Sequence, residues 1–68
     1  MVEVFKTNVQ QKKQANMLLT TISAHLPLFK VNFDLEDCDR ILRVEGINIS
    51  PEIIINLLRE KGYQCEVL

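Results

Sequence analysis

Two cysteines and a short acidic segment hold the side chains of this chain best suited to chemistry. Cys38 stands between Asp37 and Asp39, and a thiolate flanked by two carboxylates could hold a divalent ion such as Zn²⁺ weakly. The same residues also fit a solvated turn, and their spacing matches no recognised metal-ligand pattern. We therefore expect a turn without a cofactor, with a weak divalent metal site at Asp37, Cys38 and Asp39 as the alternative.

No combination of side chains predicts catalysis. The single histidine, His25, falls in the last turn of a predicted helix, where a positive charge is favoured. The chain has only two glycines, Gly46 and Gly62, and no glycine-rich phosphate loop. Acidic pairs occur on an exposed hairpin, where nothing desolvates them into an acid and base couple. We expect no enzyme activity.

Composition narrows the class of partner and the compartment. The 68 residues carry a net charge of −1, so no basic field attracts nucleic acid or anionic lipid. The apolar runs are far shorter than the roughly 20 residues that cross a bilayer. The amino-terminal residues show no signal layout, and two cysteines are too few for a disulfide scaffold. We expect one cytoplasmic domain over residues 1–68, with neither nucleic acid nor membrane as partner.

Hydrophobic periodicity divides the chain into six elements that position these residues. Alternation predicts strands over residues 2–7, 30–35, 40–45 and 64–68, with a polar hairpin tip over residues 36–39. Helical spacing begins near Val9 and stops at Pro27, and a second helix lies between Ser50 and Gly62. Ser50 is expected as its N-cap, and Gly62 as its left-handed C-terminal residue, with Tyr63 packing back on the helix.

Six elements in this order leave few topologies. Two interleaved right-handed βαβ units give an α+β, ferredoxin-like βαββαβ two-layer plait, with antiparallel sheet order 4-1-3-2 and both helices on one face. A register that opposes Val4 with Leu42 puts Phe5 opposite Ile41 on the open face. We therefore expect Phe5 and Ile41 to form a small apolar spot on the open face. Scattered apolar residues are common on protein surfaces, and the alternative is a site for a protein partner or for self-association.

Core and turn positions recur along nearly the whole length in a definite order: Val4, Thr7, Ala15, Leu19, Val31–Leu35, Val44 and Gly62–Tyr63. In these residues and in its element order the chain resembles the heavy-metal-associated domain family of small copper chaperones and metal-ATPase amino-terminal modules. The resemblance implies a ferredoxin-like fold and a metal site between the first strand and the first helix. Tyr63 resembles the tyrosine that flanks this site in bacterial relatives.

The family's metal loop reads Met-Thr-Cys-x-x-Cys, and its two thiolates hold Cu(I) or a soft divalent ion. Thr7 is retained, whereas Asn8 and Gln11 replace the cysteines and Lys6 replaces the methionine. Neutral amides are poor ligands for soft metals. We instead expect Asn8 to cap the first helix, with Gln11 as the reciprocal member of a capping box.

The two cysteines do not restore the missing site. The plait puts Cys38 and Cys65 at one end of the sheet but on opposite flanks, roughly 10–14 Å apart for strands about 4.8 Å apart. That is too far for a disulfide or for one shared metal ion. Cys65 alternates with Val67, and we expect it in the core.

The sequence therefore favours a small non-enzymatic binding or interaction module that has lost the usual soft-metal loop. One alternative is a metal-binding or metal-chaperone protein that uses Cys38 and the acidic hairpin. Another is a small-ligand sensor that dimerises through its open sheet face.

Overall fold

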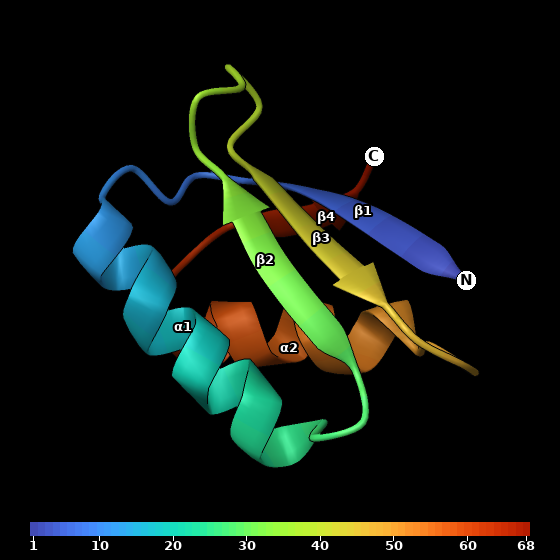
Figure 1. The fold of residues 1–68 in the computed structure, drawn as a ribbon. Coiled ribbons are helices and arrows are strands. Elements are labelled where there is room, and N and C mark those ends of the chain that lie inside the picture. Colours follow the sequence, from blue (N-terminus) through green and yellow to red (C-terminus); the bar gives the residue numbers. More distant parts are fainter.

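The computed structural model describes all of residues 1–68, and it forms a small α+β arrangement of two layers (Figure 1). The elements in chain order are β1 (Val2–Thr7), α1 (Lys12–His25), β2 (Lys30–Asp34), β3 (Ile41–Glu45), α2 (Pro51–Glu60) and β4 (Cys65–Val67). All strand pairs are antiparallel, and the order across the sheet is β2-β3-β1-β4. Counted from the other edge, this order reads 4-1-3-2, and it is compatible with a ferredoxin-like fold.

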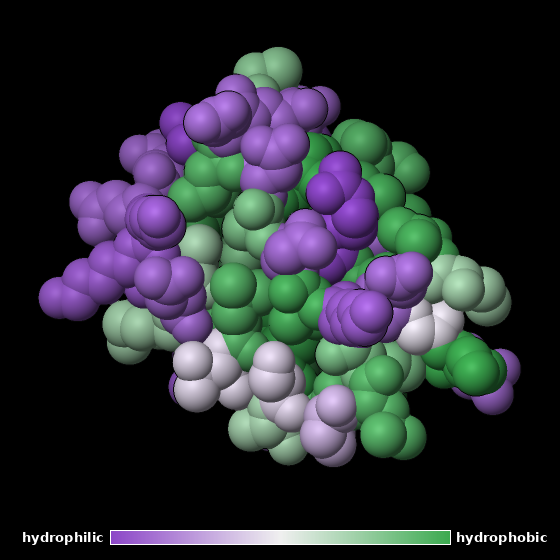
Figure 2. Space-filling model, viewed as in Figure 1, coloured by the Kyte–Doolittle hydropathy of each residue, from purple (hydrophilic) through white to green (hydrophobic).

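One hydrophobic core lies between the sheet and the two helices. Its fully buried side chains come from both layers: Phe5, Val9, Ile22, Leu42, Val44, Ile54 and Leu58. Burial of these side chains is the main favourable term in folding. In Figure 2, hydrophobic side chains fill the space between β2 and α1, while hydrophilic ones cover most of the hairpin tip and the amino-terminal part of α1. No helix combines the length and the apolar character that crossing a lipid bilayer requires.

The expected register of β1 is wrong by one residue. Phe5 pairs with Leu42, and Val4 pairs with Arg43, so Phe5 faces the helices and is 0% exposed. A shift of one residue turns every side chain of a strand to the other face. The apolar spot of Phe5 and Ile41 therefore does not exist. Ile41 lies on the outer face opposite Lys6, where it is buried outside the main core cluster.

The start of α1 also differs from the expectation. The helix begins at Lys12 with Gln11 as its N-cap, three residues later than a cap at Asn8. The main-chain N–H of Gln11 donates to Oε1 of Gln14 at 3.2 Å, so the capping box is built from Gln11 and Gln14. Asn8 was the wrong cap because its side-chain oxygen accepts a hydrogen bond from Gln64 instead.

Both ends of α2 follow the sequence signals. Ser50 is the N-cap position and Pro51 is the first helical residue, although the Ser50 side chain makes no capping hydrogen bond. At the other end Gly62 has a φ of +91°. The N–H of Gly62 donates to the Arg59 carbonyl at 2.9 Å, and that of Tyr63 donates to the Leu58 carbonyl at 3.0 Å. This pair of bonds is a Schellman motif, which confirms the role of Gly62.

Candidate functional site at the loop end of the sheet

Three loops meet at one end of the sheet, which we call the loop end. They are the end of β1 with the segment that follows it (residues 7–11), the β2–β3 hairpin tip (residues 35–40) and the segment before β4 (residues 62–64) (Figure 1). The N–H of Thr7 donates to the Asp39 carbonyl at 3.2 Å, and the N–H of Gln64 donates to Oδ1 of Asn8 at 2.8 Å. The segment after β1 therefore holds the other two loops in place.

The buried side chain of Thr7 holds the β2–β3 hairpin through a hydrogen bond to Arg40. This side chain is 6% exposed, and its hydroxyl donates to the Arg40 carbonyl at 2.6 Å while it accepts from the Val9 N–H at 3.3 Å. Arg40 has a φ of +50°, which is unfavourable for a residue with a Cβ. Its guanidinium also donates to the Leu35 carbonyl at 2.9 Å. The threonine that matches the metal-loop motif thus stabilises a strained turn in this chain.

The two positions that match the metal-binding cysteines are occupied by amides with structural contacts. Asn8 uses Oδ1 to accept the Gln64 N–H, and this bond joins residues 56 positions apart in the sequence. Gln11 stands at the N-cap of α1. Amide side chains offer neither the soft sulfur nor the negative charge that Cu(I) prefers. This loop can therefore hold the sheet and the helix together, but its chemistry does not suit a soft metal.

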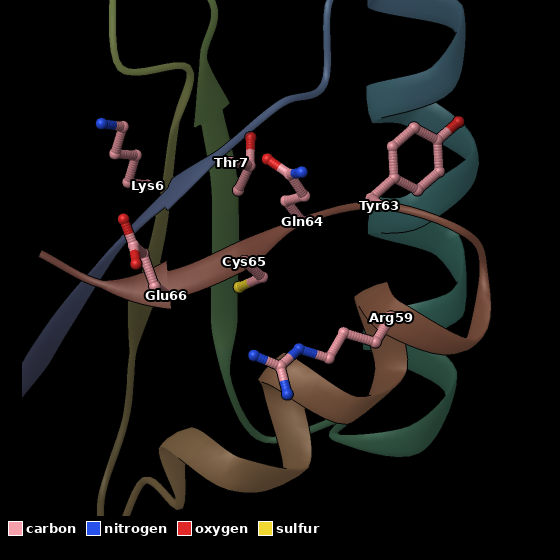
Figure 3. A pocket seen from close by; sticks show the side chains of 7 residues that line it. All are labelled: Lys6, Thr7, Arg59, Tyr63, Gln64, Cys65 and Glu66. Carbon is pink, nitrogen blue, oxygen red and sulfur yellow. The ribbon is translucent and has the colours of Figure 1, made fainter.

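A cavity of about 340 Å³ opens beside β4 at this end (Figure 3). Seven residues, two of them hydrophobic, line it from β1, α2, β4 and the segment before β4: Lys6, Thr7, Arg59, Tyr63, Gln64, Cys65 and Glu66. Lys6 and Glu66 face each other across the β1–β4 pair, whereas Arg59 reaches the cavity from the last turn of α2 (Figure 3). The structure thus brings Thr7 and Tyr63 to one cavity.

Sequence reasoning missed Arg59, Gln64 and Glu66 as members of this site. The available signal was positional, because Arg59 lies three residues before Gly62, where α2 turns back toward the sheet. A basic residue in the last helical turn is ordinarily explained by the helix dipole alone. The cavity arises only from the packing of three separate segments.

Cys65 lies at the floor of this site and behaves as a core residue, as expected. It is 4% exposed, and burial raises the pKa of its thiol from an ordinary value of 9.0 to about 11. The nearby Arg59 charge opposes this rise in pKa, and Glu66 adds to it. A raised pKa makes the thiolate form scarcer at neutral pH, which weakens Cys65 as a nucleophile and as a metal ligand. Cys65 and Cys38 are both free thiols.

The acidic hairpin tip is close enough for metal binding, but its polar groups also build the turn. One ligand atom from each of Asp37, Cys38 and Asp39 lies within 4.8 Å of the others. Oδ1 of Asp37 accepts the Asp39 N–H at 2.9 Å, and Oδ1 of Asp39 lies 3.8 Å from Nζ of Lys6. Asp37 and Cys38 are exposed, and carboxylates that cap their own turn in this way are ordinary in hairpins.

His25 lies at the opposite end of α1 from the N-cap that faces the loop end. Its ring nitrogen Nδ1 is 2.9 Å from the Thr21 carbonyl, and the side chain is exposed. This contact is local to the helix, and a histidine in the last turn is favoured by the helix dipole. The structure therefore does not bring His25 together with the other candidate residues.

Comparison of the chain with protein-family models, with curated proteins and with solved structures finds no match.

Proposed function

We propose that this chain is a small, non-enzymatic binding module of the heavy-metal-associated type, with a ferredoxin-like fold, whose loop end no longer takes a soft metal. The observation that carries the proposal is the 2.8 Å hydrogen bond from the Gln64 N–H to Oδ1 of Asn8. At the first of the two cysteine positions the side chain has become part of the scaffold. A group engaged in this way is not free to bind a metal ion.

The surroundings of the loop support the same proposal. Lys6 replaces the methionine of the resembled motif, and its ammonium group is exposed near Asp39. A fixed positive charge disfavours a bound cation. Cys65, the one thiol that lines the cavity, has a raised pKa and is neutral at physiological pH. What the loop end offers instead is a cavity with charged walls beside a strand.

A protein is the partner class that we favour. RNA-binding sheets of similar topology use exposed aromatic side chains on the central strands. In this chain the aromatic residue of β1, Phe5, is buried under the helices. The outer face of β3 carries Ile41, Arg43 and Glu45, which mixes charges of both signs. Protein recognition suits such a surface better than recognition of a polyanion.

A divalent metal site at the hairpin tip is the second candidate. The observation that favours it is the close spacing of the ligand atoms of Asp37, Cys38 and Asp39, all within 4.8 Å of one another. One thiolate and two carboxylates form a set that Zn²⁺ accepts, with water completing the coordination. Binding would compete with the turn hydrogen bond that Asp37 now makes to the Asp39 N–H.

A chelator-competition titration with Cu(I) and with Zn²⁺, read by native mass spectrometry, tests both candidates. The proposed module binds neither ion more tightly than about micromolar affinity. One equivalent bound tightly, and lost on Cys38→Ser, would show that the second candidate is correct. Tight Cu(I) binding that survives this substitution would also contradict the proposal.

A gain-of-function variant supplies the matched control. The double substitution Asn8→Cys with Gln11→Cys restores the two thiols of the resembled motif on the same scaffold. We expect this variant to bind one equivalent of Cu(I), because two thiolates are sufficient for near-linear coordination. Failure of the double variant to bind, with its fold intact, would contradict the placement of the chain with this type of module.

A further inference from the structure

β4 is an edge strand whose outward main-chain groups have no partner in the sheet. It pairs with β1 on one side only. The N–H of Gln64 and the N–H of Leu68 both point toward the β1 side, where they reach Oδ1 of Asn8 and the Val4 carbonyl. Main-chain direction alternates along a strand, so the N–H and C=O groups of Cys65 and Val67 point to the free edge. Such an edge can accept another strand.

Two cavities lie near the start of β4 and share one lining residue, Tyr63. The first, of about 340 Å³, includes residues of β4, and the second has a volume of about 170 Å³. The second cavity lies between α1 and the end of α2, and it is lined by Gln14, Met17, Leu18, Thr21, Lys61 and Tyr63. Met17 is 65% exposed there. An apolar side chain of a bound segment would cover Met17 and Tyr63 and so remove their apolar surface from water.

The residues that line the two cavities carry a net positive charge, although the whole chain is slightly negative. Lys6, Arg59 and Lys61 line the two cavities, against a single acid, Glu66. Glu66 is opposite Lys6 in the sheet register. The one ion pair within 4.0 Å in the chain joins Lys6 to Asp39, so Arg59 and Lys61 have no carboxylate partner. Charge complementarity therefore favours a partner with acidic side chains.

We propose that an extended acidic segment of a partner protein binds at this place as a fifth strand, paired with the free edge of β4. Its main chain pairs with Cys65 and Val67, its carboxylates pair with Arg59 and Lys61, and an apolar side chain fills the cavity over Met17. Strand addition of this kind combines main-chain hydrogen bonds with pockets for alternate side chains. The inference rests on the proposed function, because it names the partner of the same binding module.

A second copy of the chain is a poorer occupant of this edge. β4 has three residues with Glu66 in the middle. A two-fold pairing centred on that residue puts two Glu66 carboxylates directly opposite each other, which is destabilising. An acidic segment in an unrelated partner can instead place its carboxylates beside Arg59.

Selection from a random dodecapeptide library displayed on phage, with the full chain as bait, tests the inference. We expect enriched peptides to carry a net negative charge and an apolar residue. Synthetic copies should shift the amide resonances of Cys65 and Val67 and should slow hydrogen exchange at both. N-methylation of alternate residues in the peptide should abolish binding, because it removes the donors that pair with the strand edge.

Three variants of the chain locate the contact. Val67→Pro removes an N–H that faces the free edge and leaves the β1 pairing in place, and we expect it to weaken peptide binding about tenfold through lost main-chain hydrogen bonds. Arg59→Gln should weaken binding about threefold to tenfold, with a smaller salt dependence. Lys13→Gln is the matched control, because it removes the same charge from an exposed position of α1 and should leave affinity unchanged.

Several outcomes would overturn the inference. The selection could yield no peptides above the background of beads without the protein, or it could enrich basic peptides. Peptide binding could also be weakened by neither Val67→Pro nor Arg59→Gln. A concentration-dependent dimer in sedimentation that Val67→Pro abolishes would show that the occupant is a second copy. The copper titration distinguishes failure of the strand-addition inference from failure of the proposed function. If selection fails and Cu(I) binds weakly, only the strand-addition site is wrong.

Discussion

The side chain of Asn8 accepts a hydrogen bond from the main-chain N–H of Gln64 at 2.8 Å. This contact joins the segment after β1 to the segment before β4. The Gln64 N–H points toward β1, and by the alternation along the strand the main-chain N–H and C=O of Cys65 point to the free edge. The residue at the position of a metal-ligating cysteine in the resembled motif therefore extends the β1–β4 pairing by one further hydrogen bond.

Replacement of Asn8 should loosen β4. Asn8→Ala removes the acceptor of the Gln64 N–H, and we expect the free energy of unfolding in urea to fall by about 1 kcal/mol. Asn8→Asp keeps an acceptor oxygen at the same place and should retain most of the stability. Hydrogen exchange at Gln64 should accelerate in the alanine variant alone. Equal stability and exchange in all three proteins would show that the bond contributes nothing.

Gly62 should be difficult to replace because of its backbone conformation. At a φ of +91° a side chain is strained whatever space surrounds it, and no heavy atom lies within 4 Å of the position that a Cβ would take. Gly62→Ala should therefore lower the free energy of unfolding by about 1–2 kcal/mol, whereas Gly62→Asn should lower it less, since asparagine tolerates this region. Thermal unfolding followed by circular dichroism measures both variants. An alanine variant as stable as the wild type would contradict this reason.

Gly46 should be difficult to replace for a different reason, which is space. A Cβ atom at Gly46 would lie 2.3 Å from Cδ1 of the Phe29 ring, so the ring has to move. We expect Gly46→Ala to lower the free energy of unfolding by about 1–3 kcal/mol, as other overpacked substitutions do. Phe29→Leu in the same chain should recover part of this loss. A double-mutant cycle with no coupling between positions 29 and 46 would rule out the steric explanation.

Phe5 should be essential for stability. Its side chain is fully buried under the helices, and Phe5→Ala should lower the free energy of unfolding by about 3–5 kcal/mol. Val4 points to the outer face and is only partly buried, so Val4→Ala is the matched control and should cost less. Urea titrations of the two variants show which substitution lowers the free energy of unfolding more. A larger loss at Val4 than at Phe5 would support the register expected from the sequence.

The sequence predicted the elements better than the contacts between them. Alternation, helical spacing and the Gly62–Tyr63 signal located the six elements and the end of α2. The register of β1 could not be predicted, because both sets of alternating residues contain apolar side chains, Val2 and Val4 on one and Phe5 on the other. The larger ring of Phe5 fills the core under two helices. Which face of β1 turns to the core therefore depends on packing in three dimensions.

In the candidate site, too, local features could be predicted from the sequence and long-range contacts could not. Thr7 and Tyr63 could be named because they match a local motif, and both line the cavity. The cap of α1 was placed wrongly because Asn8 and Gln11 are both polar residues ahead of the helix. Only the long-range bond to Gln64 decides between them. Arg59 could not be named, because its contact with the cavity depends on where α2 ends relative to β4.

The pH dependence of stability should reveal the buried thiol of Cys65. Burial raises its pKa from 9.0 to about 11, so the unfolded chain loses this proton at a lower pH than the folded chain does. The contribution to stability is complete below about pH 9 and is lost as the pH rises toward about 11. Its size is roughly 2–3 kcal/mol by linkage.

Because lysines and the tyrosine titrate in the same pH window, the useful quantity is the difference in the free energy of unfolding between variants. Cys65→Ala should lose stability less steeply than the wild type between these pH values, whereas Cys38→Ser should follow the wild type. Parallel curves for Cys65→Ala and the wild type would show that the thiol titrates equally in both states.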